Sequence, residues 1–300
     1  LKMVGDELTL SKIGIITFHS AYNYGSVLQA FATQTFIKKL GSENEIINYR
    51  LDEQRRVYSN LRFNYGYKEF IKDLSLLPIY GRRNIRKEKF ETFLFENIDA
   101  SDICRTPEDV RKIWDKYPTI ISGSDQIWNK HSLELEHIDW NFMDPYLLKG
   151  YHGKKISYAS SIANMNDWEI KRILPEINDF ALLSMREETS AKKVSNYLKR
   201  NVISVLDPTF LLTKEEWIQT LHLNRDNKKF ILFYSLHGIT KFNKIKNTLI
   251  ELSKARNCKI LTITPFCYIK KSKYFEPHPE FGPHEFIESV YNSNTVITDS

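Results

Sequence analysis

The residues most capable of chemistry follow short apolar runs, and the first group follows Ile13–Thr17. Asn23, Tyr24, Gly25 and Ser26 form a polar, glycine-containing turn there, and a helical pattern begins directly after it. The order strand, turn, helix opens a doubly wound α/β domain, in which ligands lie beyond the carboxyl ends of the strands. Free N–H groups and the dipole at a helix N-terminus favour an anion. We therefore expect an anionic small molecule to bind at this turn.

A second group, Ser124, Asp125 and Gln126, follows the apolar run Thr119–Ser122. Gly123 precedes it and allows close approach of a backbone. The hydroxyl, carboxylate and amide groups offer hydrogen-bond donors and acceptors at the end of a strand. An ordinary helix-capping turn has the same composition, so the segment taken alone leaves both interpretations open.

Arg186 follows a short predicted strand and is the third candidate. The planar guanidinium suits bidentate recognition of a carboxylate or a phosphate. The alternative is that Arg186 only pairs with Glu187, Glu188 or Asp207.

Histidine and aspartate residues near the ends of predicted elements complete the set. His19 follows the first strand, and His284 lies at a predicted helix start. Asp299 and Ser300 end the last strand, again on the ligand side of a parallel sheet. A lone histidine in such a place is more often a hydrogen-bonded loop residue than a proton-transfer group.

Alternating β-rich and helical patterns must position these side chains, and they predict parallel sheets built from βαβ units. The predicted strands are 13–17, 45–48, 119–122, 155–158, 182–184, 202–205, 230–234, 259–264 and 295–298. The predicted helices are 27–40, 68–76, 85–95, 107–116, 166–180, 187–198, 241–255 and 283–291.

The pattern breaks at Asp207–Pro208, which predicts an N-terminal domain over 1–207 and a partial C-terminal domain over 208–300. A basic and aromatic segment near 52–96 is expected as a helical insertion of the first domain, with a solvated basic face. The alternative is a surface that meets an acidic acceptor or a membrane. Three predicted strands are few for a sheet with two covered faces, so we expect the protein to continue past Ser300.

Composition bounds the class of protein. The chain has 300 residues, a formal charge of +6 and three widely spaced cysteines. The modest charge suits anionic ligands or loose contact with a membrane surface, but it is too diffuse for nucleic acid. The cysteine spacing favours a reducing compartment over a disulfide framework or a zinc site. No apolar run approaches about 18 residues, so we expect a cytoplasmic protein without a transmembrane segment.

Taken together, the motifs resemble those of the polysaccharide pyruvyl transferase family, in the same order along nearly the whole chain. They are Phe18–Ala30, Ser122–Asn129 with Ile156–Ser161, Arg186–Glu188 with Leu206–Leu212, and Gly282–Phe286 with Val296–Ser300.

The resemblance implies two Rossmann-like domains, as in the two-domain (GT-B-like) glycosyltransferases. It also implies transfer of an enolpyruvyl unit from phosphoenolpyruvate to a cell-surface polysaccharide or its precursor, free or lipid-linked, with closure of a pyruvate ketal. Phosphoenolpyruvate is then a donor substrate, and no cofactor or metal is implied. This chemistry needs an anion clamp, an acid for the vinyl carbon and a base for the attacking hydroxyl.

In this family the turn at Asn23–Ser26 and Arg186 would hold the donor. Asp125 would be the base or a ligand of a sugar hydroxyl, with His19 as a weaker candidate. Ser124, Gln126, His284, Asp299 and Ser300 would complete the binding site. Family members typically continue after Ser300 into Phe-His-Gly, whose histidine is a favoured catalytic acid; we therefore expect a truncated chain that is inactive by itself.

Two other functions fit parts of the sequence. A glycosyltransferase using a sugar nucleotide could have the same architecture, although no cradle for ribose and base is evident in the second half. A non-catalytic binding module is the natural hypothesis if the protein ends at Ser300.

Overall fold

The computed structural model describes residues 12–59, 71 and 73–299. These residues form an α/β protein whose paired strands run parallel. They divide into two compact units. The first runs to Val57 and resumes over Asn97–Leu212, and the second comprises the described residues of Tyr58–Glu96 and Thr213–Ser300. The segment that we expected as an insertion of the first domain is therefore grouped mainly with the C-terminal unit.

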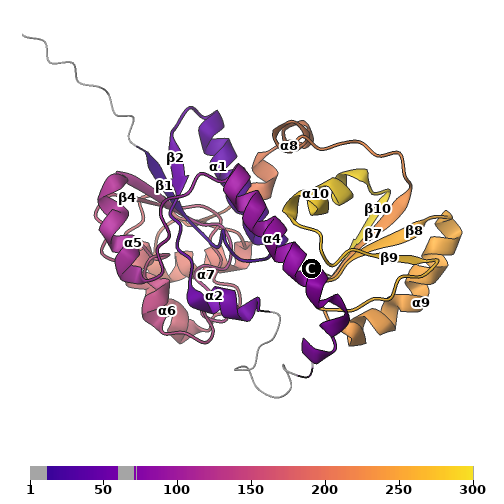
Figure 1. Cartoon of the computed structure of the whole chain (residues 1–300). Helices are drawn as coiled ribbons and strands as arrows, with labels where there is room; N and C mark the ends of the chain where they lie inside the picture. The colour runs from indigo at the N-terminus through magenta and orange to yellow at the C-terminus, as the bar shows by residue number, and fades with distance from the viewer. Residues whose placement is uncertain (1–11, 60–70, 72, 300) are drawn as a thin grey trace, which may run out of the picture. The chain divides into compact units, whose positions relative to one another are not determined.

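The main sheet of the first unit has the strand order β2-β1-β3-β4 (Figure 1). Its strands are β1 (Ile13–Ile16), β2 (Asn44–Ile46), β3 (Thr119–Ser122) and β4 (Lys154–Ser157). Single bridges extend the pairing, from Ile46 to Ala100 at one edge and from Ile156 to Leu182 at the other. The short pair β5 (Ser184–Met185) and β6 (Ile203–Ser204) follows next to the second of these bridges.

Strand order reverses between β1 and β3. From β1 the chain moves outward to β2, whereas β3 and β4 lie on the other side of β1. The loops that follow the two strands meet at this point, because the N–H of Gly123 donates to the carbonyl of Ile16 at 3.0 Å. In open parallel sheets, ligands bind outside the carboxyl ends of the strands at such a reversal.

Helices cover both faces of this sheet. They are α1 (Tyr24–Lys39), α2 (Asp52–Val57), α5 (Pro107–Ile113), α6 (Asp167–Asn178) and α7 (Glu188–Leu198), with 3₁₀ turns η3 (Trp114–Lys116), η4 (Trp140–Met143) and η5 (Pro208–Leu211). Because crossovers between parallel strands are right-handed, the change of direction after β2 sends α5 to the face opposite α1, as Figure 1 shows. The turn η5 packs against α1.

The second unit has its own parallel sheet, in the order β10-β7-β8-β9. Its strands are β7 (Phe230–Tyr234), β8 (Lys259–Ile263), β9 (Phe275–Pro277) and β10 (Thr295–Thr298). Its helical elements are η2 (Leu77–Ile79), α4 (Tyr80–Asn97), α8 (Lys214–Leu221), α9 (Ile239–Arg256) and α10 (Pro283–Asn292). Here the strand order reverses between β7 and β10, so this sheet also has a crevice position of the kind found in the first unit.

Some elements differ from the sequence prediction. The second sheet has a fourth strand, β9, where the pattern predicted three strands in all. Helix α8 was not predicted, whereas α2 lies at the start of the segment near 52–96 that was expected to be helical. The helix predicted over 68–76 lies mostly outside the described residues.

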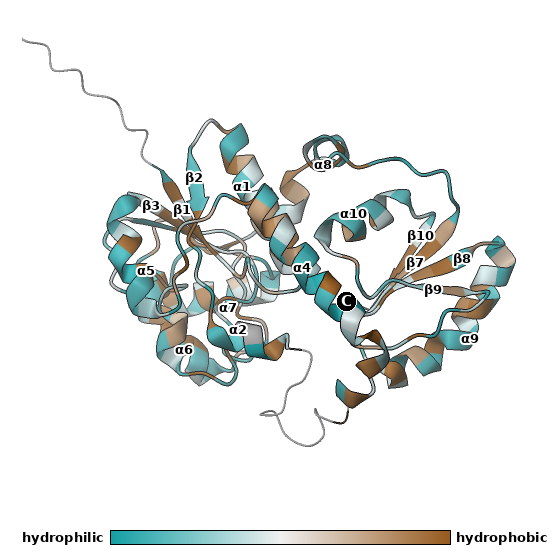
Figure 2. Cartoon of the chain, viewed as in Figure 1, coloured by the Kyte–Doolittle hydropathy of each residue, from teal (hydrophilic) through white to brown (hydrophobic). Residues whose placement is uncertain are grey.

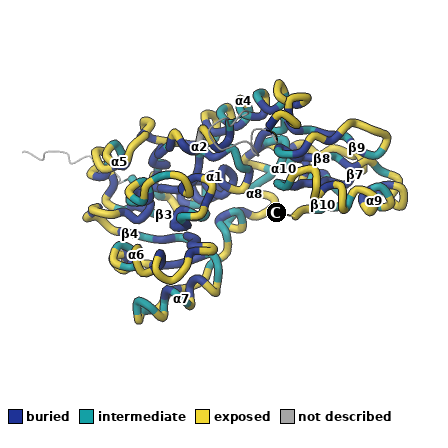
Figure 3. The backbone as a smooth tube through the Cα atoms, turned by 90° about the horizontal axis from the view of Figure 1, so that it is seen from below, coloured by how far each residue is buried: buried dark blue, intermediate teal, exposed yellow. Residues whose placement is uncertain are grey.

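Each unit has a separate hydrophobic core. Large aromatic side chains fill the first, including Phe18, Trp128 and Phe180, each at most 1% exposed. The second core includes Phe233, Phe242 and Phe275. Figure 2 shows apolar residues along β7 and β8, and Figure 3 shows β7 as buried, as expected for strands that contribute to the second core. Within the described ranges, no helix combines the length and apolar character needed to cross a bilayer.

Candidate functional site

The turn predicted to bind an anion lies at the N-terminus of α1. Asn23 is the N-cap, and its side-chain oxygen accepts a hydrogen bond from the N–H of Gly25 at 2.9 Å. The first turn carries no acidic residue. The helix therefore presents its positive end at the carboxyl edge of β1, next to Ser26.

Asp125 lies beside this helix end. The hydroxyl of Ser26 donates to Oδ2 of Asp125 at 2.6 Å, although the two residues are 99 positions apart in the chain. The loop that brings Asp125 here depends on Gly123, which has a φ of +127°. A Cβ atom at Gly123 would lie 2.1 Å from the carbonyl oxygen of Tyr158. Only glycine fits this backbone conformation and this space.

Gln29 on α1 connects the loops that follow β1 and β3. Its side chain is 2% exposed, and its amide nitrogen donates to Thr17 Oγ1 at 2.8 Å and to the carbonyl of Ser26 at 2.9 Å. Its amide oxygen accepts from the N–H of Ser124 at 3.2 Å. Thr17 in turn donates to the carbonyl of Ser124 at 2.8 Å. These bonds hold the two loops at one place.

Arg186 extends the group to the next strands of the unit. Its Nη1 lies 4.0 Å from Asp125 Oδ1 and 3.4 Å from Asp207 Oδ2, and its Nε donates to Glu187 at 3.1 Å. Burial lowers the pKa of Arg186, but the charges of these carboxylates outweigh burial and raise it above its ordinary value. The guanidinium is therefore always charged. Ser26, Asp125, Arg186 and Asp207 are called the Asp125 cluster below.

Two residues, Asp207 of the cluster and Tyr158, whose pKa responds to the charge of Asp207, were not singled out from the sequence. Asp207 appeared there only as a possible partner of Arg186, yet it also caps η5 by accepting from the N–H and hydroxyl of Thr209. Tyr158 follows β4, and burial together with the charge of Asp207 raises the pKa of its phenol. The position of both residues at strand ends is the signal that could have pointed to them.

His19 is enclosed in the fold. It is 1% exposed, with Nε2 2.9 Å from Asn48 Oδ1 and Nδ1 3.3 Å from the carbonyl oxygen of Thr17. Arg50 donates to the same oxygen of Asn48 at 2.8 Å. This geometry favours the hydrogen-bonded loop residue that the sequence offered as the alternative.

Three other predicted site residues take part in the fold around the cluster. Tyr24 is 1% exposed. The hydroxyl of Ser124 donates to the carbonyl of Ala159 at 2.7 Å, and the amide oxygen of Gln126 accepts from Asn129 at 2.8 Å. Ser124 and Gln126 thus fix the loop that carries Asp125.

The remaining predicted residues belong to the second unit. Asp299 follows β10, where its Oδ2 accepts from the hydroxyl of Ser235 at 2.9 Å. His284 lies in the first turn of α10, with Nε2 2.9 Å from the carbonyl oxygen of Leu221, the last residue of α8. Ser300 lies outside the described residues.

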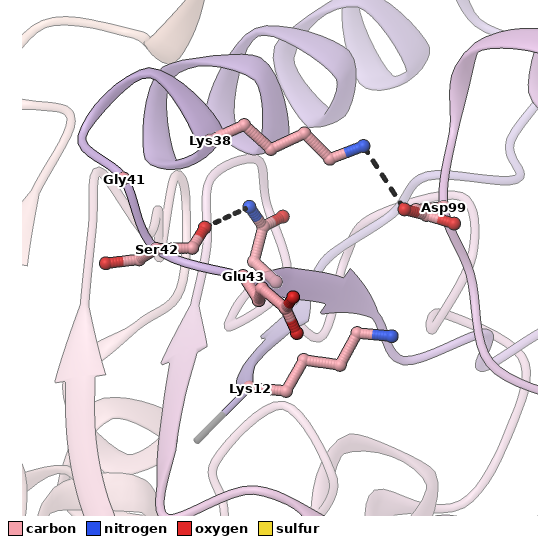
Figure 4. Close-up of a pocket in the computed structure, with 7 residues that line it drawn as sticks. Lys12, Lys38, Gly41, Ser42, Glu43 and Asp99 are labelled. Atoms are coloured by element: carbon pink, nitrogen blue, oxygen red, sulfur yellow. Dashed lines mark hydrogen bonds and ion pairs between the residues drawn. The ribbon is translucent and has the colours of Figure 1, made fainter. Parts of the chain in front are cut away.

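An open pocket in the first unit lies away from these groups (Figure 4). Its volume is about 470 Å³, and it is lined by Lys12, Lys38, Gly41, Ser42, Glu43, Asn44 and Asp99. Lys12 precedes β1 and Asn44 begins β2, so the pocket is at the amino ends of the strands, opposite the Asp125 cluster. Both lysines already pair with carboxylates, Lys12 with Glu45 and Lys38 with Asp99. The pocket therefore offers no clear anion site.

Comparison with known proteins identifies the family. The model of the family described as polysaccharide pyruvyl transferase matches residues 23–300, so the chain belongs to that family. No curated protein matches the sequence. Among solved structures, a UDP-N-acetylglucosamine 2-epimerase from Rickettsia bellii is similar with a TM-score of 0.42 and 10% sequence identity, over 97% of this chain and 74% of that chain. Family membership supports a transferase of polysaccharide pyruvylation in general.

Proposed function

We propose that the protein transfers a pyruvyl unit from phosphoenolpyruvate to a saccharide and closes a ketal across two of its hydroxyls. The acceptor class is a cell-surface polysaccharide or its precursor. The observation that carries the proposal is the Asp125 cluster of a pyruvyl transferase family member, located where the strand order of the first sheet reverses. That is the expected ligand position of an open parallel sheet.

Arg186 and the start of α1 supply the anion-binding groups in this proposal. Among the residues that the structure describes, none accepts a hydrogen bond from Nη2 of Arg186, because the carboxylates contact Nε and Nη1. Nη2 is thus the guanidinium nitrogen left for the donor carboxylate or phosphate. The N-terminal N–H groups of α1, next to Gly25 and Ser26, add a second source of positive potential.

The carboxylates of the cluster suit the saccharide. Arg186 has three acidic neighbours, so their charges exceed its own. Carboxylate oxygens accept hydrogen bonds from sugar hydroxyls, and Asp125 is the candidate base or hydroxyl ligand. We therefore assign the anionic donor to Nη2 of Arg186 and the start of α1, and the saccharide to the carboxylates of the cluster.

We also propose that the two units are Rossmann-like domains of a GT-B-like transferase. Each contains a parallel sheet with one reversal of strand order and helices between its strands. Polar side chains follow the strands at both reversals.

Thermal unfolding tests the donor. With phosphoenolpyruvate at about 100 times its Kd, the chain should gain roughly 2.7 kcal/mol. For a unit of this size, the gain corresponds to a rise in Tm of roughly 5–10 °C. The shift should vanish in Arg186→Ala. Glu188→Gln is the matched control, because Glu188 is the next acid along the chain and pairs with Lys192; this variant should keep the shift.

Two outcomes would contradict the proposal. If phosphoenolpyruvate still raises the Tm of Arg186→Ala, the donor does not bind at the Asp125 cluster. A sugar nucleotide that raises the Tm while phosphoenolpyruvate does not would favour the glycosyltransferase hypothesis.

A further inference from the structure

The positive charge of the chain is unevenly distributed. Residues 239–276, which run from the start of α9 into β9, contain nine lysine and arginine residues and two glutamates. Their formal charge of +7 exceeds the +6 of the whole chain, so the remaining residues together carry a slight negative charge. The average over the whole chain therefore hides a concentration of positive charge in one segment of the second unit.

Five of these cations gather where α9 ends and β9 begins. Two lie in the last turn of α9 and three in the turn that precedes β9, namely Lys254, Arg256, Lys270, Lys271 and Lys273. The ring of Tyr274 joins the two groups, with Lys254 Nζ 5.8 Å and Lys273 Nζ 5.0 Å from its centroid. The carbonyl of Tyr274 also accepts from the N–H of Ile260 in β8 at 2.8 Å. The five cations are called the basic patch below.

Folding alone explains only part of the basic patch. All five residues are exposed, and within the described ranges no carboxylate lies within 4 Å of any of them, whereas the neighbouring Lys259 pairs with Glu276. The charges of Lys254 and Arg256 suit the negative end of α9. The three lysines of the turn belong to no helix, and like charges held close together repel one another and oppose the compact state. A negatively charged partner would relieve this repulsion.

The composition of the basic patch favours an extended anionic surface over a single bound anion. Four of its five cations are lysines, whose ammonium groups act as point charges. Recognition of individual phosphates or bases relies more on the planar fork of arginine. Attraction to anionic lipid headgroups depends mainly on the number of cations near the surface. Tyr268, 40% exposed, precedes the turn and adds an amphipathic ring of the kind enriched at membrane interfaces.

We propose that the basic patch attaches the second unit to the surface of an anionic lipid bilayer. The attachment is electrostatic and reversible, because the attraction acts only within a Debye length, about 8 Å at physiological salt. The proposal goes beyond the transfer reaction and does not depend on the donor. A protein held at a bilayer in this way would meet a lipid-linked acceptor at the same surface.

Vesicle sedimentation tests the attachment. The chain should sediment with phosphatidylcholine vesicles that contain about 30% phosphatidylglycerol, whose surface potential is negative. Salt at about 1 M should release it, because the Debye length falls to about 3 Å. Vesicles of phosphatidylcholine alone should leave the chain in the supernatant. The proposal is wrong if both kinds of vesicle bind equally, if neither binds, or if salt has no effect.

Charge neutralisation tests the site. The triple variant Lys270→Gln, Lys271→Gln, Lys273→Gln should bind the anionic vesicles about 100-fold more weakly, from the summed contribution of three lysines near an anionic surface. These side chains are exposed, so the Tm of the variant should match that of the native chain.

The matched control lowers the net charge by the same amount at other places. It neutralises three exposed lysines that pair with carboxylates, Lys112, Lys192 and Lys228. This variant should bind the anionic vesicles as the native chain does. Equal weakening in the two triple variants would show that net charge, and not the basic patch, is responsible for binding.

Lysine acetylation distinguishes a bilayer from an acidic polymer. Mass spectrometry measures the rate at each lysine, and anionic vesicles should slow acetylation of Lys270, Lys271 and Lys273 several-fold. The rate at Lys228, which is 84% exposed, should not change. If dextran sulfate protects the three lysines and the anionic vesicles do not, the basic patch binds an acidic polymer and the bilayer proposal is wrong.

Discussion

At the scale of single residues, Gly123 has the least freedom to change. A Cβ atom there would meet a backbone oxygen at 2.1 Å, and the φ of +127° is unfavourable for any other residue. We expect Gly123→Ala to lower the free energy of unfolding by at least 2–3 kcal/mol, the range for overpacking combined with backbone strain. Urea unfolding at pH 7 measures the difference.

Gly41 provides the matched control for that prediction. It also has a positive φ, +82°, but a Cβ atom there meets nothing within 4 Å. Gly41→Ala should therefore cost only the left-handed conformation, about 1–2 kcal/mol. Equal losses in the two variants would show that the contact with the Tyr158 carbonyl oxygen is unimportant.

The candidate site was partly predictable from its residues. Asn23, Asp125 and Arg186 were each expected at the carboxyl end of a strand, because local patterns of apolar and polar residues reveal where strands end. The hydrogen bond between Ser26 and Asp125 was not, since it depends on β1 and β3 being neighbours in the sheet. No local pattern encodes that adjacency. For the same reason the hydrogen bond between Ser235 and Asp299 emerged only from the fold.

At the scale of elements, Arg82 connects α4 to the segment that follows β9 within the second unit. Its Nε donates to Glu280 at 2.7 Å, and its Nη2 donates to the carbonyl of Pro277 at 2.6 Å. Lys89, farther along α4, forms an ion pair with Glu285 of α10. A guanidinium reaches its two acceptors from separate nitrogens of a planar group, which an ammonium does not reproduce, so the residue type matters here.

We expect Arg82→Met to destabilise this attachment by about 1 kcal/mol, a value reduced for the partial exposure of the pair. Amide hydrogen exchange in α4 should accelerate, while Glu88→Gln on the same helix should leave it unchanged. Burial raises the pKa of Glu280, but the hydrogen bond from His278 and the charge of Arg82 outweigh it and hold the pKa below its usual value. The difference in the free energy of unfolding between Arg82→Met and the native chain should therefore be largest above about pH 5 and should decrease as the pH falls through the lowered pKa of Glu280. A difference that does not change with pH would exclude Glu280 as the partner of Arg82.

Most strands and long helices were predicted within a few residues, because their apolar runs are strong. Strand β9 was not predicted because it has only three residues and one of them is Pro277. Proline is tolerated at the edge of a sheet, but it does not indicate a strand in the sequence. Helix α8 did carry a signal: Thr213 and Glu216 form a capping box. The break at Asp207–Pro208 obscured it. The grouping of α4 with the C-terminal unit depends on Arg82 and Lys89 contacts made about 200 residues away in sequence, beyond any local pattern.

At the scale of the whole molecule, the separate cores predict separate unfolding. Cys104 is buried in the first core and Cys267 in the second, with exposures of 3% and 2%. Burial is the main cause that raises the pKa of each thiol to about 11. Because the thiolate is the reactive form, both should resist alkylation at pH 8 in the native chain, whereas the partly exposed Cys258 should react first.

The same two thiols report on each unit during denaturation. Labelling with iodoacetamide across a urea series, followed by mass spectrometry, should give different midpoints for Cys104 and Cys267. Coincident midpoints would mean that the two cores unfold as one cooperative block.

The amide of Gln29 has a consequence for how this protein can change over evolution or in the laboratory. One side chain ties Thr17, Ser26 and Ser124 together, and its oxygen and nitrogen ends are not interchangeable. The loops after β1 and β3 are therefore not independent modules that can be diversified one at a time. A library that randomises 23–26 alone can keep the bond of Gln29 to the backbone of Ser26, but most of its members lose the hydrogen bond from Ser26 to Asp125 in the second loop. New acceptor specificity is best sought by varying both loops together while Gln29 is kept, because substitutions that share a partner are strongly non-additive.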